Sequence, residues 1–338
     1  MKRLLVVLLL ALCGSSLIGA PQAVAGSGPA HIAAEPSVDQ WLMRLHAASR
    51  GRAYMGTFVV STDRSMSSSR IWHVCNGQQQ VERVEALTGE PRSTYRRNDQ
   101  VVTFLPGRRV VVHEKRESLG LFPDLLGRAD SSLARYYRLK TLGRDRVAGL
   151  DADMAQLIPF DALRFGYRIW TEHQTGLVVK LQTLDKTDAV LEQAAFSELQ
   201  LNAPVAMSRL SAQMDNRQGY RLRVAELVKT TAAQEGWLLK ALVPGFRAIS
   251  CNKQAETNMA RDGGRALQCV FSDGLASVSL FMEPFDASQH STAQQRAPVG
   301  MGATQVLTQR VGDWWLTAVG EVPYQTLILF AQGLERTK

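Results

Sequence analysis

The chain has 338 residues, of which 45% are hydrophobic and 21% are charged, and its formal net charge is +8. After the N-terminal segment, the positive surplus is divided evenly between residues 26–205 and the rest of the chain, which argues against a basic arm for binding nucleic acid. The length exceeds what one hydrophobic core usually serves, so we expect two domains.

The N-terminus has the three parts of a secretory signal peptide. Lys2 and Arg3 supply the positive region, residues 4–12 form a nine-residue apolar stretch, and Ala23-Val24-Ala25 provides small residues for cleavage. The apolar stretch is too short to span a bilayer, which needs about 20 residues. Lipid attachment at Cys13 is disfavoured because Leu12 before it is large. We therefore expect residues 1–25 to be removed and the mature protein to be exported and soluble.

Residues 26–203 are expected to form the first domain, beginning with a helix at Ser37–Arg50. Ser37 and Gln40 fit a capping box, and Gly51 ends the apolar periodicity. Short strand-like segments follow at regular spacing with turn residues between them, which predicts an antiparallel meander or an open barrel. These segments are Tyr54–Ser61, Arg70–Cys75, Gln80–Leu87, Arg92–Arg97, Val101–Leu105, Val110–Glu114, Tyr137–Leu142, Asp153–Pro159 and Val190–Leu201.

Residues Phe165–Asp185 predict an antiparallel hairpin with one face on a core. Apolar residues alternate before and after the loop His173-Gln174-Thr175-Gly176. The opposite face carries Arg168, Trp170, Lys180 and Gln182, as expected for a surface that is wet or faces a ligand.

The segment Leu119–Arg138 changes to helical spacing and has an excess of large apolar side chains. It is either a helix that plugs the open side of the sheet or a mobile lid over an apolar cavity. For the second alternative, the residues expected to line the cavity are Leu121, Phe122, Leu125, Leu126, Tyr167 and Trp170.

Residues 204–225 are mostly polar and weakly patterned, so we expect a linker there, followed by a second domain at 226–338. Its predicted strands are Trp237–Leu242, Phe246–Cys251, Ala266–Phe271, Ser277–Glu283, Met301–Arg310 and Trp314–Glu321. Pro323 opens a closing helix, Tyr324–Leu334. A sheet covered by one terminal helix fits this pattern.

Three cysteines remain after cleavage. Cys251 and Cys269 lie near facing ends of two predicted strands, so in an oxidising compartment we expect them to form a disulfide. Cys75 is then unpaired and is expected to pack against the sheet. No histidine or second cysteine stands at ligand spacing from any of the three, so no metal site is expected.

Basic residues are concentrated between positions 92 and 116: Arg92, Arg96, Arg97, Arg108, Arg109, Lys115 and Arg116. This excess is either a solvated strand surface or a docking face for an acidic partner or lipid head groups. The sequence lacks the GxSxG, HExxH, P-loop, GxGxxG and CxxC motifs, and its histidines are scattered. We therefore predict a binding protein without a cofactor, and not an enzyme.

Two groups of residues, taken with their order and spacing along the chain, resemble the sequence of one family. The first comprises residues 146–149, Pro159, Asp161, residues 164–170, residues 175–177, Lys180 and residues 184–185. The second comprises Pro244-Gly245-Phe246, residues 271–281 and Glu283. Together with Tyr54, residues 56–58 and residues 191–193, they resemble the MucB/RseB family of periplasmic regulators over nearly the whole mature chain.

The resemblance implies an α+β fold. The first domain would be an antiparallel open β half-barrel with helices in its mouth, similar to the lipoprotein carrier LolA. The second would be a smaller α/β domain with an antiparallel sheet and a terminal helix. It also implies a periplasmic protein of the envelope stress response that binds no nucleic acid.

The resemblance further implies the partner, the periplasmic domain of a membrane anti-sigma factor of the RseA/MucA type. Binding would protect that domain from proteolysis and keep the sigma factor inactive, while lipopolysaccharide or lipoprotein acyl chains would occupy the apolar cavity. The docking residues expected are Arg108, Arg109, Ser272, Asp273, Gly274 and Leu275. A periplasmic carrier or chaperone of lipids or lipoproteins is the alternative, and self-association is left open.

Overall fold

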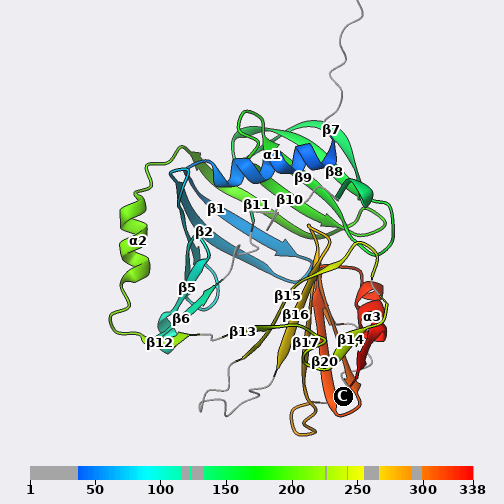
Figure 1. The fold of residues 1–338 in the computed structure, drawn as a ribbon. Helices are drawn as coiled ribbons and strands as arrows, with labels where there is room; N and C mark the ends of the chain where they lie inside the picture. The colour runs from blue at the N-terminus through cyan, green and yellow to red at the C-terminus, as the bar shows by residue number, and fades with distance from the viewer. Residues whose placement is uncertain are drawn as a thin grey trace, which may run out of the picture. The chain divides into compact units, whose positions relative to one another are not determined.

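The computed structural model describes residues 37–115, 122–123, 133–224, 227–241, 243–254, 266–290 and 299–337, so the predicted signal peptide lies outside the described residues. These residues form one sheet of twelve strands, one of seven and a pair of short strands, with three α-helices (Figure 1). None of the described helices is long and apolar enough to cross a membrane.

The first sheet has the order β12-β6-β5-β4-β3-β2-β1-β11-β10-β9-β8-β7. Its strands are β1 Tyr54–Thr62, β2 Met66–Cys75, β3 Gln80–Ala86, β4 Ser93–Arg97, β5 Gln100–Leu105, β6 Val110–Lys115, β7 Tyr137–Val147, β8 Leu150–Pro159, β9 Gly166–Glu172, β10 Val178–Leu184, β11 Val190–Leu201 and β12 Arg221–Val224. All neighbours are antiparallel except β12, which runs parallel to β6. The sheet has two free ends and is not closed, so the predicted open antiparallel fold is confirmed.

The first helix, α1 (Val38–Arg50), begins at the predicted capping box. The Ser37 hydroxyl accepts the N–H of Gln40 at 3.2 Å, and the Gln40 side chain accepts the N–H of Ser37 at 3.3 Å. Trp41, Leu42 and Leu45 on one side of the helix are buried in the core of the first sheet. The helix therefore covers part of that core, as its apolar periodicity predicts.

The predicted hairpin is β9 and β10, and its register is confirmed by the pairing of Ile169 with Leu181. The connecting turn is held by the Glu172 carboxylate, which accepts the backbone N–H groups of Gln174 and Thr175 at 3.2 and 2.7 Å. Gly176 follows with φ of +76°, a conformation that favours glycine. Period-two alternation and turn chemistry thus specify this element locally.

The two faces of the first sheet can be followed through the register. Phe58 of β1 pairs with Phe196 of β11, Ala194 of β11 with Leu181 of β10, and Leu181 with Ile169 of β9. Directly paired residues share one face of a sheet, so these side chains form the inner face and belong to or contact the main core. The helix α2 (Met207–Asp215) lies along the outer face (Figure 1).

Residues 204–225 were expected to be a linker, but most of this stretch is structured on the first sheet. Leu210 and Met214, one helical turn apart on α2, are buried against the outer-face clusters that contain Val81 and Val102. Strand β12 then pairs with β6. The sequence pattern missed both elements because α2 has only two buried side chains and β12 is exposed at all four residues.

The second sheet has the order β13-β15-β16-β17-β20-β19-β18. Its strands are β13 Leu227–Thr230, β15 Arg247–Gln254, β16 Leu267–Ser272, β17 Ser277–Pro284, β18 Val299–Met301, β19 Thr304–Val311 and β20 Trp314–Gly320, while β14 Trp237–Leu239 pairs with β21 Leu334–Arg336. The single strand expected at Met301–Arg310 is instead a hairpin that turns at Gly302, where φ is +60°.

The closing helix α3 (Tyr324–Gly333) covers the second sheet with Leu327, Phe330 and Ala331, all buried. The Phe330 ring contacts those of Phe246 and Phe271, with centroid distances of 5.6 and 5.1 Å. The predicted terminal helix over an antiparallel sheet is therefore confirmed.

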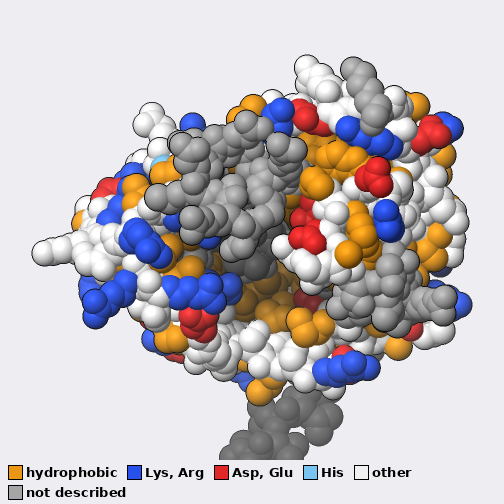
Figure 2. Space-filling model, turned by 90° about the horizontal axis from the view of Figure 1, so that it is seen from below, with side chains coloured by type: hydrophobic (Ala, Val, Ile, Leu, Met, Phe, Trp, Pro, Cys, Tyr) orange, Lys and Arg blue, Asp and Glu red, His pale blue; other side chains and the backbone are white. Residues whose placement is uncertain are grey.

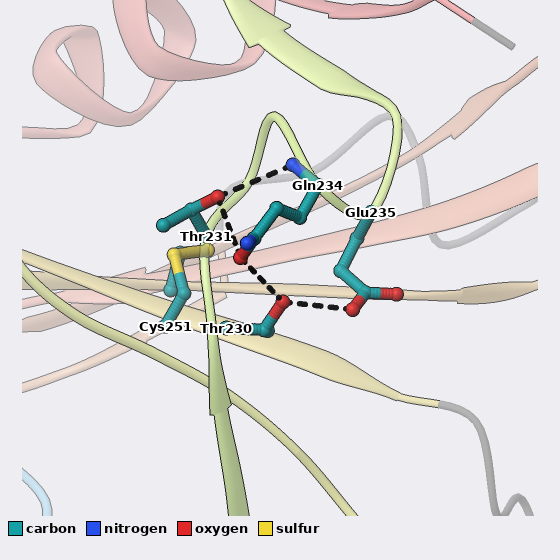
Figure 3. Close-up of a disulfide and its surroundings, with 6 residues drawn as sticks. Thr230, Thr231, Gln234, Glu235 and Cys251 are labelled. Atoms are coloured by element: carbon teal, nitrogen blue, oxygen red, sulfur yellow. Dashed lines mark hydrogen bonds between the residues drawn. A yellow bond between two sulfur atoms is a disulfide. The ribbon is translucent and has the colours of Figure 1, made fainter.

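The predicted disulfide between Cys251 and Cys269 is confirmed. The two cysteines lie directly opposite each other on β15 and β16, with a Cα–Cα distance of 4.1 Å. Thr230, at the end of β13, pairs with Cys251 on the other side of β15 from Cys269. The Thr230 hydroxyl donates to Glu235 at 2.8 Å (Figure 3). The disulfide thus lies beside the strand that enters the second sheet. Cys75 is a half-buried free cysteine.

Candidate ligand-binding and docking sites

The inner face of the first sheet carries a cluster of three phenylalanines. The Phe122 ring lies 5.5 Å from that of Phe58 and 5.0 Å from that of Phe196. Of the insert residues that were expected to line a cavity, Phe122 is the one that the structure describes, and its side chain is buried. Leu121, Leu125 and Leu126 lie outside the described residues. Figure 2 shows hydrophobic side chains in the hollow at the centre of one face of the molecule.

Tyr167 and Trp170 cannot line one cavity together, which corrects the expectation from sequence. They are three residues apart on β9, so their side chains point to opposite faces of the sheet. Tyr167 is on the inner face, where its ring lies 6.3 Å from that of Tyr137. Trp170 is on the outer face and is buried: its Nε1 donates to Asp145 at 2.9 Å, and the Lys180 ammonium lies 4.3 Å from the ring. The Trp170 side chain is therefore exposed neither to solvent nor to a ligand.

A pocket of about 520 Å³ lies at the end of α1, and none of the three clustered phenylalanines lines it. Arg44 and Arg52 line it together with Thr175 and Asn202, and more of its surface is polar than apolar. Such a lining does not suit an acyl chain, which is bound by burial of apolar surface.

Asp273 joins the two sheets. One carboxylate oxygen accepts Arg164 Nε at 2.7 Å and the Tyr137 hydroxyl at 3.2 Å, and both donors come from the first domain. The other oxygen accepts the backbone N–H groups of Leu275 and Ala276 at 2.9 and 2.8 Å. The Asp273 side chain has no exposed surface. It is therefore unavailable to a protein partner, contrary to the expectation from sequence.

The rest of the turn expected to dock a partner also serves the contact between the domains. Ser272 accepts the N–H of Gly274 at 2.9 Å and donates to the carbonyl of Ala276 at 2.8 Å, which closes the turn. Leu275 packs against the core of the first sheet. In the opposite direction, Leu163 of the first domain packs against the second core, and its carbonyl accepts the Thr326 hydroxyl at 2.8 Å. The segment Ser272–Leu275 therefore contacts the first domain of its own chain.

A second contact between the sheets involves two carboxyl groups that the sequence did not single out. The backbone N–H of Ala303 bonds to Glu192 on the inner face of β11. Gly302 beside it lies so close that an added Cβ would be 2.6 Å from Thr62 Cγ2 and 2.8 Å from Glu192 Oε2. Burial raises the pKa of Glu192, an effect that the Ala303 N–H partly offsets.

Glu321 is exposed, yet the protein atoms around its carboxyl partly desolvate it. This desolvation and the negative charge of Glu192 raise the pKa of Glu321. Burial also raises the pKa of Tyr167 well above its ordinary value, with the charge of Glu321 as the next cause. The inner rim of the first sheet is therefore coupled electrostatically to the second domain. In the sequence, Glu192 could have been found by looking for single acidic residues next to apolar strand positions.

The predicted basic surface is smaller in the structure than in the sequence. Arg96 is buried beside Glu82, with 3.6 Å between the charged atoms, and Arg97 makes two bonds to Asp215 of α2 at 2.9 and 3.1 Å. Arg108 and Arg109 are exposed, and Arg108 lies 3.5 Å from Glu90. These two therefore remain on the surface.

Within the described parts of the chain, no group of three or more His, Cys, Asp or Glu side chains is placed to hold a metal ion. The polar groups brought together at Asp273 satisfy one another through hydrogen bonds. The chemistry that this arrangement supports is recognition by apolar contact, charge and strand pairing.

Comparison with known proteins covers both domains. Residues 37–214 match the family model of the MucB/RseB N-terminal domain, and residues 231–335 match that of the MucB/RseB C-terminal domain. The sigma factor AlgU regulatory protein MucB of Pseudomonas aeruginosa is 30% identical over 317 residues, which is 92% of each chain. The sigma-E factor regulatory protein RseB of Escherichia coli is 23% identical, covering 90% of this chain and 93% of that one.

Solved structures agree with these sequence matches. The crystal structure of MucB in complex with MucA(peri) has a TM-score of 0.65 at 26% identity and covers 90% of this chain and 100% of that one. The crystal structure of MucB has a TM-score of 0.60 at 25% identity, with 88% and 96% covered.

Proposed function

This chain belongs to the MucB/RseB family of sigma factor regulatory proteins, and from that membership we propose that it binds the periplasmic domain of a membrane-spanning anti-sigma factor. Bound there, it shields that domain from the protease that starts its degradation. The envelope-stress sigma factor consequently stays sequestered. The protein acts in the periplasm, after cleavage of the N-terminal segment that has the features of a signal peptide.

The observation that carries this proposal is the likeness to MucB in complex with MucA(peri), which extends over 90% of this chain. Apart from β12 and β13, the strands of both sheets fall within the matched family regions. A carrier of lipids needs only the first sheet and its inner face. The second sheet has its own core of eighteen buried residues, and binding of a protein partner accounts for its presence.

We also propose that acyl chains of lipopolysaccharide or of lipoproteins bind at the inner face around Phe122. The three phenyl rings supply apolar surface there, and burial of acyl carbons contributes about 0.8 kcal/mol per methylene group. The inner face continues to Tyr137 and Tyr167, and Tyr137 bonds to Asp273 of the second domain. A ligand that displaces these side chains changes the contact between the domains and thereby releases the anti-sigma factor.

The test is a protection assay with the mature chain, residues 26–338. The periplasmic domain of a MucA-type anti-sigma factor is digested with the protease that cleaves it, alone and with a molar excess of this protein. We expect its half-life to lengthen at least tenfold, and an equal amount of an unrelated exported protein to leave it unchanged. Vesicles containing lipid A should then shorten the half-life. Lipid binding without any protection would instead support the carrier function.

A further inference from the structure

Strand β12 is an open edge of the first sheet. Among the described residues it pairs with β6 on one side and with no strand on the other. The N–H of Arg221 donates to the carbonyl of Arg109 at 2.9 Å, so the backbone of Arg221 points towards β6. Because backbone direction alternates along a strand, the N–H and C=O groups of Leu222 and Val224 point to the open side. They are available to a further strand.

The side chains of β12 divide its two faces into an apolar one and a basic one. Leu222 and Val224 share the outer face, where 47% and 50% of their surfaces are exposed. Leu222 is paired with Val111 and therefore continues an outer-face cluster beyond the last covered strand. Arg221 and Arg223 occupy the inner face, and both are exposed.

The opposite edge of the same sheet is protected against pairing. Strand β7 has an irregular register between Thr141 and Gly143, and it exposes Arg138 and Lys140 on its first half. Proteins use such irregularities and charges to keep edge strands from pairing with other chains. Strand β12 also exposes two basic residues, Arg221 and Arg223, but unlike β7 it has a regular register and exposes two aliphatic side chains. An edge of this kind is suited to receiving a strand.

The positive charge near β12 indicates what kind of strand would bind at this edge. Arg109, Arg221 and Arg223 are exposed, and none of them forms an ion pair with a described carboxylate, whereas Arg108 lies 3.5 Å from Glu90. Figure 2 shows Lys and Arg side chains gathered on the side of the molecule where β6 and β12 lie in Figure 1. An approaching segment is therefore favoured if it carries negative charge.

From these observations we propose that the open edge of β12 binds an extended segment of the protein partner by strand addition. The segment alternates apolar and acidic residues. Its apolar side chains lie on the outer face beside Leu222 and Val224, and its acidic side chains lie on the inner face beside Arg221 and Arg223. This inference rests on the proposed function, because it takes the anti-sigma periplasmic domain as the partner.

The first experiment measures the Kd of the mature chain for that periplasmic domain by calorimetry. Cross-strand pairs contribute modestly one by one, so each face is changed by two substitutions. We expect the Leu222→Asp/Val224→Asp and Arg221→Glu/Arg223→Glu variants each to bind about tenfold more weakly. Matched controls are Met66→Asp/Leu87→Asp, exposed apolar residues elsewhere in the first domain, and Arg138→Glu/Lys140→Glu on β7. The controls should change Kd less than about twofold.

The second experiment does not depend on disruption. Val224→Cys is made together with Cys75→Ser, and single cysteines are placed in turn along the partner segment. Disulfides form only when Cα atoms come within about 7 Å, so strand addition predicts efficient cross-linking at alternate positions. Cross-linking without that alternation, or none at all, would overturn the proposal.

The outcomes separate this proposal from the proposed function. If the unmodified chain fails to bind the periplasmic domain, the proposed function itself is wrong. If it binds and the β12 variants bind equally well, only strand addition at β12 is wrong. Light scattering covers the remaining case: if the β12 variants lose self-association but bind the partner normally, the edge receives a second copy of this chain and the proposal is overturned.

Discussion

Arg164 of the first domain and Asp273 of the second are joined by a hydrogen bond of 2.7 Å, and neither side chain has exposed surface. The remaining donors of Arg164 bond to the carboxylate of Asp161 and, at 2.7 Å, to the carbonyl of Pro244. Gly245 follows Pro244 with φ of +84°, and a Cβ there would lie 2.2 Å from Arg164 Nη2. Buried charge is tolerated here because each group has its partners.

Removing one partner of this pair should destabilise the protein strongly. The Asp273→Ala variant leaves the Arg164 guanidinium buried with one carboxylate fewer, which costs about 3 kcal/mol of the free energy of unfolding. Urea unfolding followed by tryptophan fluorescence measures the loss. The control is Asp313→Ala, since Asp313 is 98% exposed and lies 3.6 Å from Arg310; it should cost less than about 0.5 kcal/mol. Equal losses in the two variants would contradict the assignment.

The disulfide should stabilise the second domain independently of the domain contact. Cys251 and Cys269 are 18 residues apart, and closing a loop of this length stabilises the folded state by about 3 kcal/mol in the chain-entropy account. The Cys251→Ser/Cys269→Ser variant should therefore unfold at lower urea concentration than the Cys75→Ser control. Peptide mapping without reductant gives a direct check, and free thiols at both positions in exported protein would disprove the bond.

Local patterns in the sequence were sufficient for most strands and for two of the helices. The hairpin of β9 and β10 follows from alternating apolar residues and a glycine turn, and the capping box of Ser37 and Gln40 fixes the start of α1. These features involve residues close in sequence, whose interactions do not depend on how the domains meet. The disulfide was predictable because its cysteines occupy matching positions in neighbouring strands.

The contacts between the domains could not be predicted in the same way. The segment Ser272–Leu275 has the composition of an exposed turn, and nothing local shows that Asp273 is buried against Arg164. Trp170 follows the polar alternation of β9, but Asp145 and Lys180 cover it from other strands. Burial of this kind depends on residues distant in sequence, so periodicity alone assigns such side chains to the wrong environment.

The carboxyl groups of Glu192 and Glu321 should make stability depend on pH. Desolvation by nearby protein atoms raises the pKa of both above the ordinary value of 4.5 in the folded protein, and the charge of Glu192 adds to the shift of the exposed Glu321. The folded state therefore binds these protons more tightly, and the resulting stabilisation is complete below about pH 4.5 and lost as the pH rises through the raised values. Glu321→Gln should accordingly be more stable than the unmodified protein at pH 7 and equally stable near pH 4, as measured by urea unfolding.

A carboxyl group with the opposite shift provides the control for this pH dependence. Hydrogen bonds from the side chain and backbone of Thr187 lower the pKa of Asp185. Its contribution to stability is present above about pH 4 and lost at lower pH. The Asp185→Asn variant should therefore be less stable at pH 7, opposite in sign to Glu321→Gln. Variants that shift in the same direction at pH 7 would show that the changes do not arise from these titrations.

We expect Phe122 to contribute more to the affinity for an acyl ligand than an exposed phenylalanine does. Its ring packs between Phe58 and Phe196 on the inner face, so Phe122→Ala should weaken binding of a fluorescent acyl probe about tenfold and lower stability by about 1–3 kcal/mol. Phe160→Ala is the matched control, because Phe160 is 61% exposed. Leu125→Asp tests the lid prediction at a second position of the same insert. If the probe binds all three variants as it binds the unmodified protein, the insert is a plug that completes the core, and the acyl site lies elsewhere.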